Sequence, residues 1–197
     1  MWVRSAAIRP IPPYAELSAD ALSEAEIWLS GGEALDERQA ESRLQEAFER
    51  FERRQPALAE RIGGELSRTA DEVAVALGFY LSSLLWLSFE QCFDKRLARV
   101  SETAVASVDQ SLKLDEELRG ADPVEAVDSD DVVAMEQPHA LDLIQEHVEA
   151  ALEAHAEAAD VDAVHRVYRL LLVQVLALSY AVLPPDGTPP PTGEICA

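Results

Sequence analysis

The stretch VAVALGFYLSSLLWLSF, residues 73–89, is apolar on every side of the helix that it predicts. A second such stretch, LLLVQVLALSYAVL, covers residues 170–183. A helix that is apolar all round lies either at the centre of a soluble fold or across a membrane. With 17 and 14 residues, the two stretches lie at and below the lower limit for spanning, and both contain polar side chains. We therefore expect a dry central helix pair, in which Ala74, Gly78 and Ser82 form a smooth ridge for close packing.

The remaining sequence predicts amphipathic helices around this pair. Ser18 and Ser101 are good N-cap residues, Gly31 suits a helix end, and Pro56 and Pro138 suit the first turn of a helix. Helices are expected over residues 18–30, 34–54, 56–68, 71–93, 101–120, 138–155 and 162–183, with short helical pieces in 121–136. The fold class is therefore all-α, a multi-helix bundle. One domain, 17–183, is expected between an extended arm, 1–16, and a flexible proline-rich tail, 184–197.

Side-chain spacing predicts which residues of these helices face the core. In the second helix the apolar residues recur at i, i+3, i+4 and i+7, and the helix after Pro138 carries a similar stripe. Cys92 is flanked by Phe89 and Phe93, so burial is expected for its thiol. The predicted core-facing residues of these two helices are Leu44, Ala47, Phe48, Phe51, Leu141, Ile144, Val148, Ala151, Leu152 and, in part, His155.

Three pairs of short motifs favour an internal duplication. Leu17-Ser18 matches Val100-Ser101, Gln55-Pro56 matches Gln137-Pro138, and Leu87-Ser88-Phe89 matches Leu178-Ser179-Tyr180. The motifs occur in the same order and at the same places in the helix plan. The sequence thus favours two helical halves, 17–95 and 100–183, related by a pseudo-two-fold axis. Chance recurrence in Ala- and Leu-rich helices is the alternative.

The charge of the chain is strongly negative and unevenly distributed. The sequence has 37 Asp and Glu residues against 16 Lys and Arg residues, a net charge of −21. From Asp115 to Asp162 there are 16 acidic residues and one basic residue, Arg119. Such a surface repels nucleic acid and anionic lipid and attracts a basic protein, although a solvated face that keeps the chain soluble has the same composition. Neither direct nucleic-acid binding nor membrane association is expected. The candidate partner-binding residues are Asp128, Asp130, Asp131, Glu146, Glu149, Glu153 and Glu157.

No motif in the sequence indicates catalysis. The four histidines, His139, His147, His155 and His165, lie in the acidic half, but none forms a Glu-x-x-His or His-x3-His pair within one predicted helix. The run from Asp128 to Asp131 lacks the glycine of a calcium loop, and phosphate-binding and nucleophile motifs are absent from the sequence. We therefore expect no catalytic residue, metal ligand or cofactor.

Three functions remain open on the sequence alone. The first is a non-catalytic acidic adaptor or scaffold that binds a protein with a basic surface. The second is an acidic inhibitor or nucleic-acid mimic that occupies a basic cleft. The third is a metal-dependent helical enzyme. With two cysteines and no secretory leader in MWVRSAAIRPIPPY, a cytoplasmic protein is expected. The sequence leaves the oligomeric state open.

Overall fold

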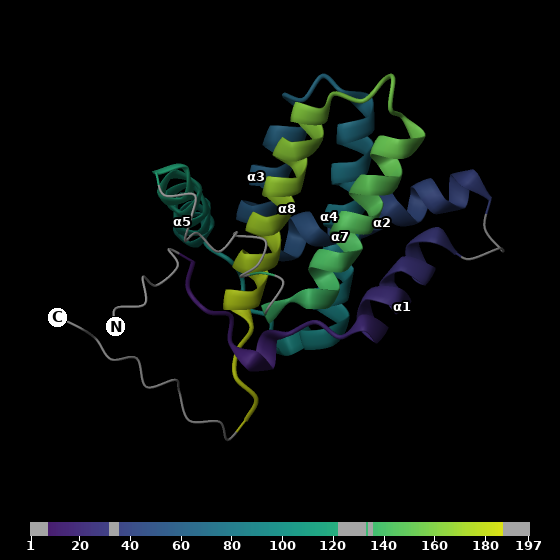
Figure 1. Cartoon of the computed structure of the whole chain (residues 1–197). Helices are drawn as coiled ribbons and strands as arrows, with labels where there is room; N and C mark the ends of the chain where they lie inside the picture. The colour runs from purple at the N-terminus through teal and green to yellow at the C-terminus, as the bar shows by residue number, and fades with distance from the viewer. Residues whose placement is uncertain (1–7, 32–35, 122–132, 134–135, 187–197) are drawn as a thin grey trace.

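The structure, a computed structural model, describes residues 8–31, 36–121, 133 and 136–186, and this part of the chain is a helical bundle (Figure 1). The predicted all-α class is confirmed. In this part the β-structure consists of one isolated antiparallel bridge, Leu97 to Val182. The α-helices are α1 (Ala19–Ser30), α2 (Glu37–Arg54), α3 (Pro56–Leu66), α4 (Glu72–Phe93), α5 (Glu102–Ala121), α7 (Pro138–Ala154) and α8 (Val161–Ala181), and the 3-10 turns are η1 (Pro13–Ala15) and η3 (Asp94–Arg96).

The helices begin and end where the sequence supplies caps. The Ser18 hydroxyl accepts the backbone N–H of Ala21, and the Ser101 hydroxyl accepts that of Ala104, both at 3.2 Å. Each bond satisfies an N–H group that has no partner inside its helix. Gly31 ends α1 with φ 68°, a left-handed conformation that glycine adopts without steric cost.

The two apolar helices, α4 and α8, run parallel at the centre of the bundle (Figure 1). At their starts, the Asp71 carboxylate accepts the backbone N–H of Asp160 at 2.9 Å. Midway along, the Gln174 side-chain amide donates to the Ser82 carbonyl at 2.8 Å. Beyond their ends, Leu97 and Val182 form the antiparallel bridge. Contacts at three levels thus hold the helices side by side along their whole length.

The predicted ridge of small residues on α4 is the surface that permits this approach. Ala74, Gly78 and Ser82 are all buried. A Cβ atom at Gly78 would lie 2.6 Å from a Leu66 methyl and 3.0 Å from a Val167 methyl. The first distance is too short for two carbon atoms and the second is tight, so a side chain at this position would force Leu66 and Val167 to shift.

Helix α2 covers another side of α4 with its aromatic stripe. The Phe51 ring stacks on Trp86, with ring centroids 5.4 Å apart, and both side chains are fully buried. Phe48 lies against Phe79 at 4.5 Å, at the partly exposed edge of the same contact. The predicted apolar stripe of the second helix is therefore the face that meets the central pair.

Two core assignments made from the sequence are wrong. Cys92 is exposed, because at the last turn of α4 the core covers only the side that carries Phe89 and Phe93. His155 is also exposed, because α7 ends at Ala154 and the chain leaves the helix before His155 can face inward. Both errors arise at helix ends, where periodicity no longer reports on packing.

Two buried glutamines make matching contacts across the bundle. At the start of α3, Gln55 accepts the N–H of Val100 at 2.7 Å and donates to the Ala98 carbonyl at 2.9 Å. At the start of α7, Gln137 accepts the N–H of Leu17 at 2.9 Å and donates to the Ala15 carbonyl at 2.6 Å.

The backbone at the two glutamines is also alike, with φ and ψ of −132° and 59° at Gln55 and −139° and 55° at Gln137. Each glutamine binds the segment that leads into the first helix of the other half of the sequence. Gln55 thus connects α3 to the segment before α5, and Gln137 connects α7 to the segment before α1.

Among the described residues, one helical stretch, Glu72–Arg96, is long and apolar enough to cross a membrane by length and composition. An 18-residue window within this stretch has a mean hydropathy of 1.6, and 67% of the window is buried inside the fold. The core helix of a soluble protein passes the same test.

Substitution of Gly78 tests the central contact. Gly78→Val should lower the free energy of unfolding by about 1–3 kcal/mol, because the added methyl groups overlap Leu66 and Val167. Gly63→Ala is the control: nothing lies within 4 Å of its added Cβ atom, so better helix propensity should raise stability by about 0.5–1 kcal/mol. Urea denaturation measures both values. Equal effects of the two substitutions would contradict the close approach at Gly78.

Candidate functional site

The acidic residues predicted to bind a partner lie on the exposed side of α7 where the structure describes them. Glu146, Glu149 and Glu153 are exposed at positions i, i+3 and i+7 of this helix. Glu157 is exposed in the turn that follows. Asp128, Asp130 and Asp131 lie outside the described residues. The structure thus places three of the predicted residues in one stripe and one just beyond it.

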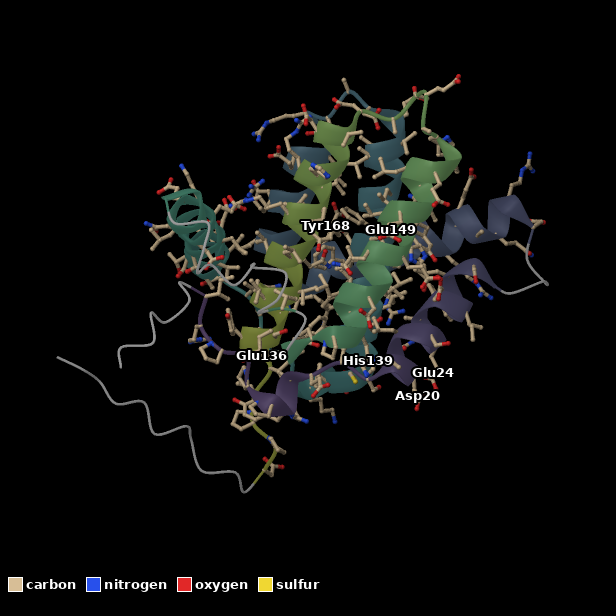
Figure 2. All side chains as sticks on the ribbon, viewed as in Figure 1. Asp20, Glu24, Glu136, His139, Glu149 and Tyr168 are labelled. Carbon is tan, nitrogen blue, oxygen red and sulfur yellow. The ribbon has the colours of Figure 1, made fainter. Side chains whose placement is uncertain are left out.

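The structure shows three further exposed acidic residues on α1 and α7 that the sequence analysis missed. Asp142 is exposed one turn before Glu146, and the same spacing argument could have identified it. Asp20 and Glu24 are exposed on α1, which packs against α7. Figure 2 shows both beside His139, at the start of α7. Because Asp20 and Glu24 are far from α7 in the sequence, no spacing pattern could predict that they lie near this helix. The α1/α7 acidic face comprises Asp20, Glu24, Asp142, Glu146, Glu149 and Glu153.

Neither α1 nor α7 contains a Lys or Arg residue that could offset this charge. Within the described part of the chain, none of the six carboxylates of the face forms an ion pair or a hydrogen bond through its side chain. Their charge is directed to solvent. A surface of this kind produces an electrostatic potential that attracts cationic groups and repels anionic ones.

A half-buried cluster behind the face holds α1 and α7 together. The Glu26 carboxylate on α1 lies 3.3 Å from His147 Nε2 on α7, and His147 Nδ1 lies 3.0 Å from the Leu143 carbonyl. The His147 ring packs against Tyr80 of α4, with ring centroids 5.5 Å apart. Burial, together with the charge of Glu26, raises the pKa of Tyr80 to about 12, so its hydroxyl stays protonated. These contacts link both helices to the central pair.

Most arginines of the described residues are bound to other parts of the same chain. Arg50 and Arg54 reach Glu90, while Arg96 donates to the carbonyls of Leu183 and Tyr14. Arg99 donates to backbone carbonyls at the end of α2. The scarce positive charge is therefore used to connect helices, which leaves the excess of carboxylates facing outward.

One arginine network joins three helices at a partly buried position. The Arg169 guanidinium of α8 lies 2.6 Å from Asp109 and 2.7 Å from Glu116, both on α5. Arg61 of α3 lies 3.5 Å from the second oxygen of Asp109. Burial by itself would raise the pKa of Asp109, but the hydrogen bond and charge of Arg169, assisted by Arg61, hold it below its ordinary value. Asp109 thus remains ionised and connects α3, α5 and α8.

The described residues contain no group of three or more His, Cys, Asp or Glu side chains that could hold a metal ion. His139, His155 and His165 are exposed and separate from one another, and His147 is engaged with Glu26. The described residues therefore provide a charged surface for recognition, and they do not bring a nucleophile together with a base.

The chain has no match in three comparisons with known proteins. No family model, no curated protein sequence and no solved structure matches it. Its function is therefore inferred from the contacts, charges and exposure of the described residues.

Replacement of Asp109 tests the arginine network. Asp109→Asn should lower the free energy of unfolding by about 1 kcal/mol at pH 7, because it removes the charge shared by Arg169 and Arg61. The pKa of Asp109 is lower in the folded protein, so its contribution is present above the ordinary value of 3.8 and is lost as the pH falls through the lowered value.

Urea denaturation of wild type and Asp109→Asn at a series of pH values measures this loss. The two stabilities should converge as the pH falls below 3.8. Asp20→Asn is the control, and its effect should stay within about 0.5 kcal/mol because its carboxylate is exposed. A difference between wild type and Asp109→Asn that does not change with pH would exclude the ionised network.

Proposed function

We propose that this protein is a non-catalytic helical interaction module, an adaptor or scaffold, that binds a protein with a basic surface. The observation that supports this proposal is the α1/α7 acidic face. It carries six exposed carboxylates on two packed helices that contain no Lys or Arg. Complementary charge of this kind accelerates association and selects among partners.

The rigidity of the face supports recognition of a specific partner. The Glu26 contact to His147 and the packing of His147 on Tyr80 hold α1 and α7 against the core. A partner that docks here meets two helices already held in place, so little backbone freedom is lost on binding. Ile27, 60% exposed on α1, adds an apolar contact next to the acidic residues.

The charge also limits the classes of partner and the place of action. The acidic face opposes a phosphate backbone or an anionic bilayer, so the proposed partner is a protein and the proposed location is the cytoplasm. Binding should weaken as salt is added, because exposed charges are screened over about 8–10 Å at 0.1–0.15 M ionic strength.

Affinity capture with matched variants tests the proposed face. The face variant is Glu146→Gln/Glu149→Gln/Glu153→Gln, and the control is Glu41→Gln/Glu46→Gln/Glu52→Gln, which removes the same charge from exposed positions of α2. We expect the face variant to reduce recovery of salt-sensitive partners by about tenfold or more, with little change for the control. Quantitative mass spectrometry of proteins retained at low and high salt measures the recovery.

Equal capture by the face variant and wild type would overturn the proposal. Loss by both triple variants would also contradict it, because net charge and not the α1/α7 acidic face would then control binding. Competition between DNA and the chain for the captured partner would replace the adaptor by an inhibitor that mimics nucleic acid.

We further propose that the interaction module consists of two duplicated halves related by a pseudo-two-fold axis. The support is the matching pattern of contacts, since α1 packs on α4 and α7 while α5 packs on α8 and α3. Gln55 and Gln137 also bind the segments before α5 and α1 in the same way. Ser88 and Ser179 each donate to the carbonyl four residues earlier.

Substitution of the two glutamines tests this reciprocity. Gln55→Ala and Gln137→Ala should each lower the free energy of unfolding by about 2–4 kcal/mol, because each leaves a buried N–H and a buried carbonyl without their partner. The loss at Gln137 should be the larger, since its amide also donates to Ser179 at 2.9 Å. Chemical denaturation measures both. A large loss at one position with none at the other would contradict equivalent halves.

A further inference from the structure

A cavity of about 420 Å³ lies between α5, α8 and the two segments that lead into α1 and α5. Its floor consists of buried apolar side chains, among them Val108, Leu176 and Ala177. The wall formed by α5 carries Ala104 and Ser107, which are too small to fill the space. A volume of this size is typical of small-molecule sites, which are mainly apolar with a few polar groups.

The corresponding place in the first half is filled by aromatic rings. Leu87-Ser88-Phe89 and Leu178-Ser179-Tyr180 align the two central helices, and this alignment sets Trp86 opposite Ala177. Trp86 is fully buried and stacked on Phe51. The second half therefore has a methyl group where the first half has an indole ring. The cavity itself does not depend on this alignment.

Two arginines, Arg9 and Arg99, lie at the mouth of the cavity although the whole chain has a charge of −21. Arg9 lies over the Tyr180 ring, 4.2 Å from its centroid, and within the described part its guanidinium makes no hydrogen bond or ion pair. Arg99 uses Nε and Nη2 for carbonyls of α2, which leaves Nη1 for another acceptor. Helix α5 also begins here, with Ser101 as its cap, and the N-terminus of a helix favours negative charge.

Two carboxylates, Glu136 and Glu102, lie near the mouth. The negative charge of Glu136 raises the pKa of Tyr180, and a carboxylate oxygen of Glu136 accepts the backbone N–H of Ile11. Glu102 lies in the first turn of α5 with its side chain exposed. Burial raises the pKa of Tyr180 to about 12, with Arg9 acting to lower it and Glu136 to raise it. The phenol is therefore neutral.

We propose that this cavity binds a small amphipathic anion, a carboxylate with a short alkyl or aryl body. The apolar body occupies the floor formed by Val108, Leu176 and Ala177. The carboxylate lies at the mouth, where the guanidinium of Arg9 and Nη1 of Arg99 supply charged N–H donors. A neutral ligand would form no ion pair with Arg9 or Arg99, and a cation would be repelled by both.

Calorimetric titration of the full chain with sodium octanoate tests this site, with octylamine as the cation of equal chain length. We expect saturable binding of one octanoate per chain and no binding of octylamine. Ala177→Trp places in the cavity the ring that the first half carries, so it should abolish octanoate binding. Arg9→Gln/Arg99→Gln should weaken octanoate by about tenfold or more, whereas Arg38→Gln/Arg68→Gln, with the same change in net charge, should not.

Four results would overturn the proposal. They are no saturable octanoate binding to wild type, unchanged binding to Ala177→Trp, equal binding of octylamine, and equal weakening by the two arginine pairs. If Ala177→Trp loses its thermal transition, Ala104→Phe fills the same cavity from the less buried α5 side and is judged by the same criterion. The triple variant of the α1/α7 acidic face should retain octanoate binding, so failure of the partner proposal and failure of the ligand proposal are distinguishable.

Discussion

The parallel contact between α4 and α8 is the constraint on which the other features of the bundle depend. Two helices that are apolar on nearly every side leave no surface that can face water, so the remaining helices must cover them. Gly78 favours this contact, because a Cβ atom there would force the side chains of Leu66 and Val167 to shift. The hydrogen bond from Gln174 to the Ser82 carbonyl then sets the position of one helix along the other.

The distribution of charge follows from this arrangement. Arginines are few, and several bridge helices around the central pair, as Arg169 does between α8 and α5. The exposed carboxylates of α1 and α7 have no such bridge within the described residues, and they form the α1/α7 acidic face. At the α5/α8 cavity, by contrast, two arginines, Arg9 and Arg99, lie at the mouth. The proposed protein partner and the proposed small anion therefore use different helices and opposite charges.

Helix spans and the central pair could be predicted because their signals are local. All-round apolarity identified α4 and α8, and serine, glycine and proline identified the helix ends. Glu146, Glu149 and Glu153 could be predicted as one exposed stripe from their spacing alone. Cys92 and His155 were assigned wrongly, because exposure at a helix end depends on which neighbouring helix covers that turn.

The sequence by itself determined an acidic, all-helical chain with two dry helices, since these properties depend on residue type and on period along one segment. The tertiary structure alone decided that α1, which carries Asp20 and Glu24, packs against α7, and that Ala177 lines a cavity with Arg9 and Arg99 at its mouth. It also decided that Gln55 binds the segment before α5 and Gln137 the segment before α1. These features depend on contacts between residues far apart in the chain, and the periodicity of a single helix carries no information about such contacts.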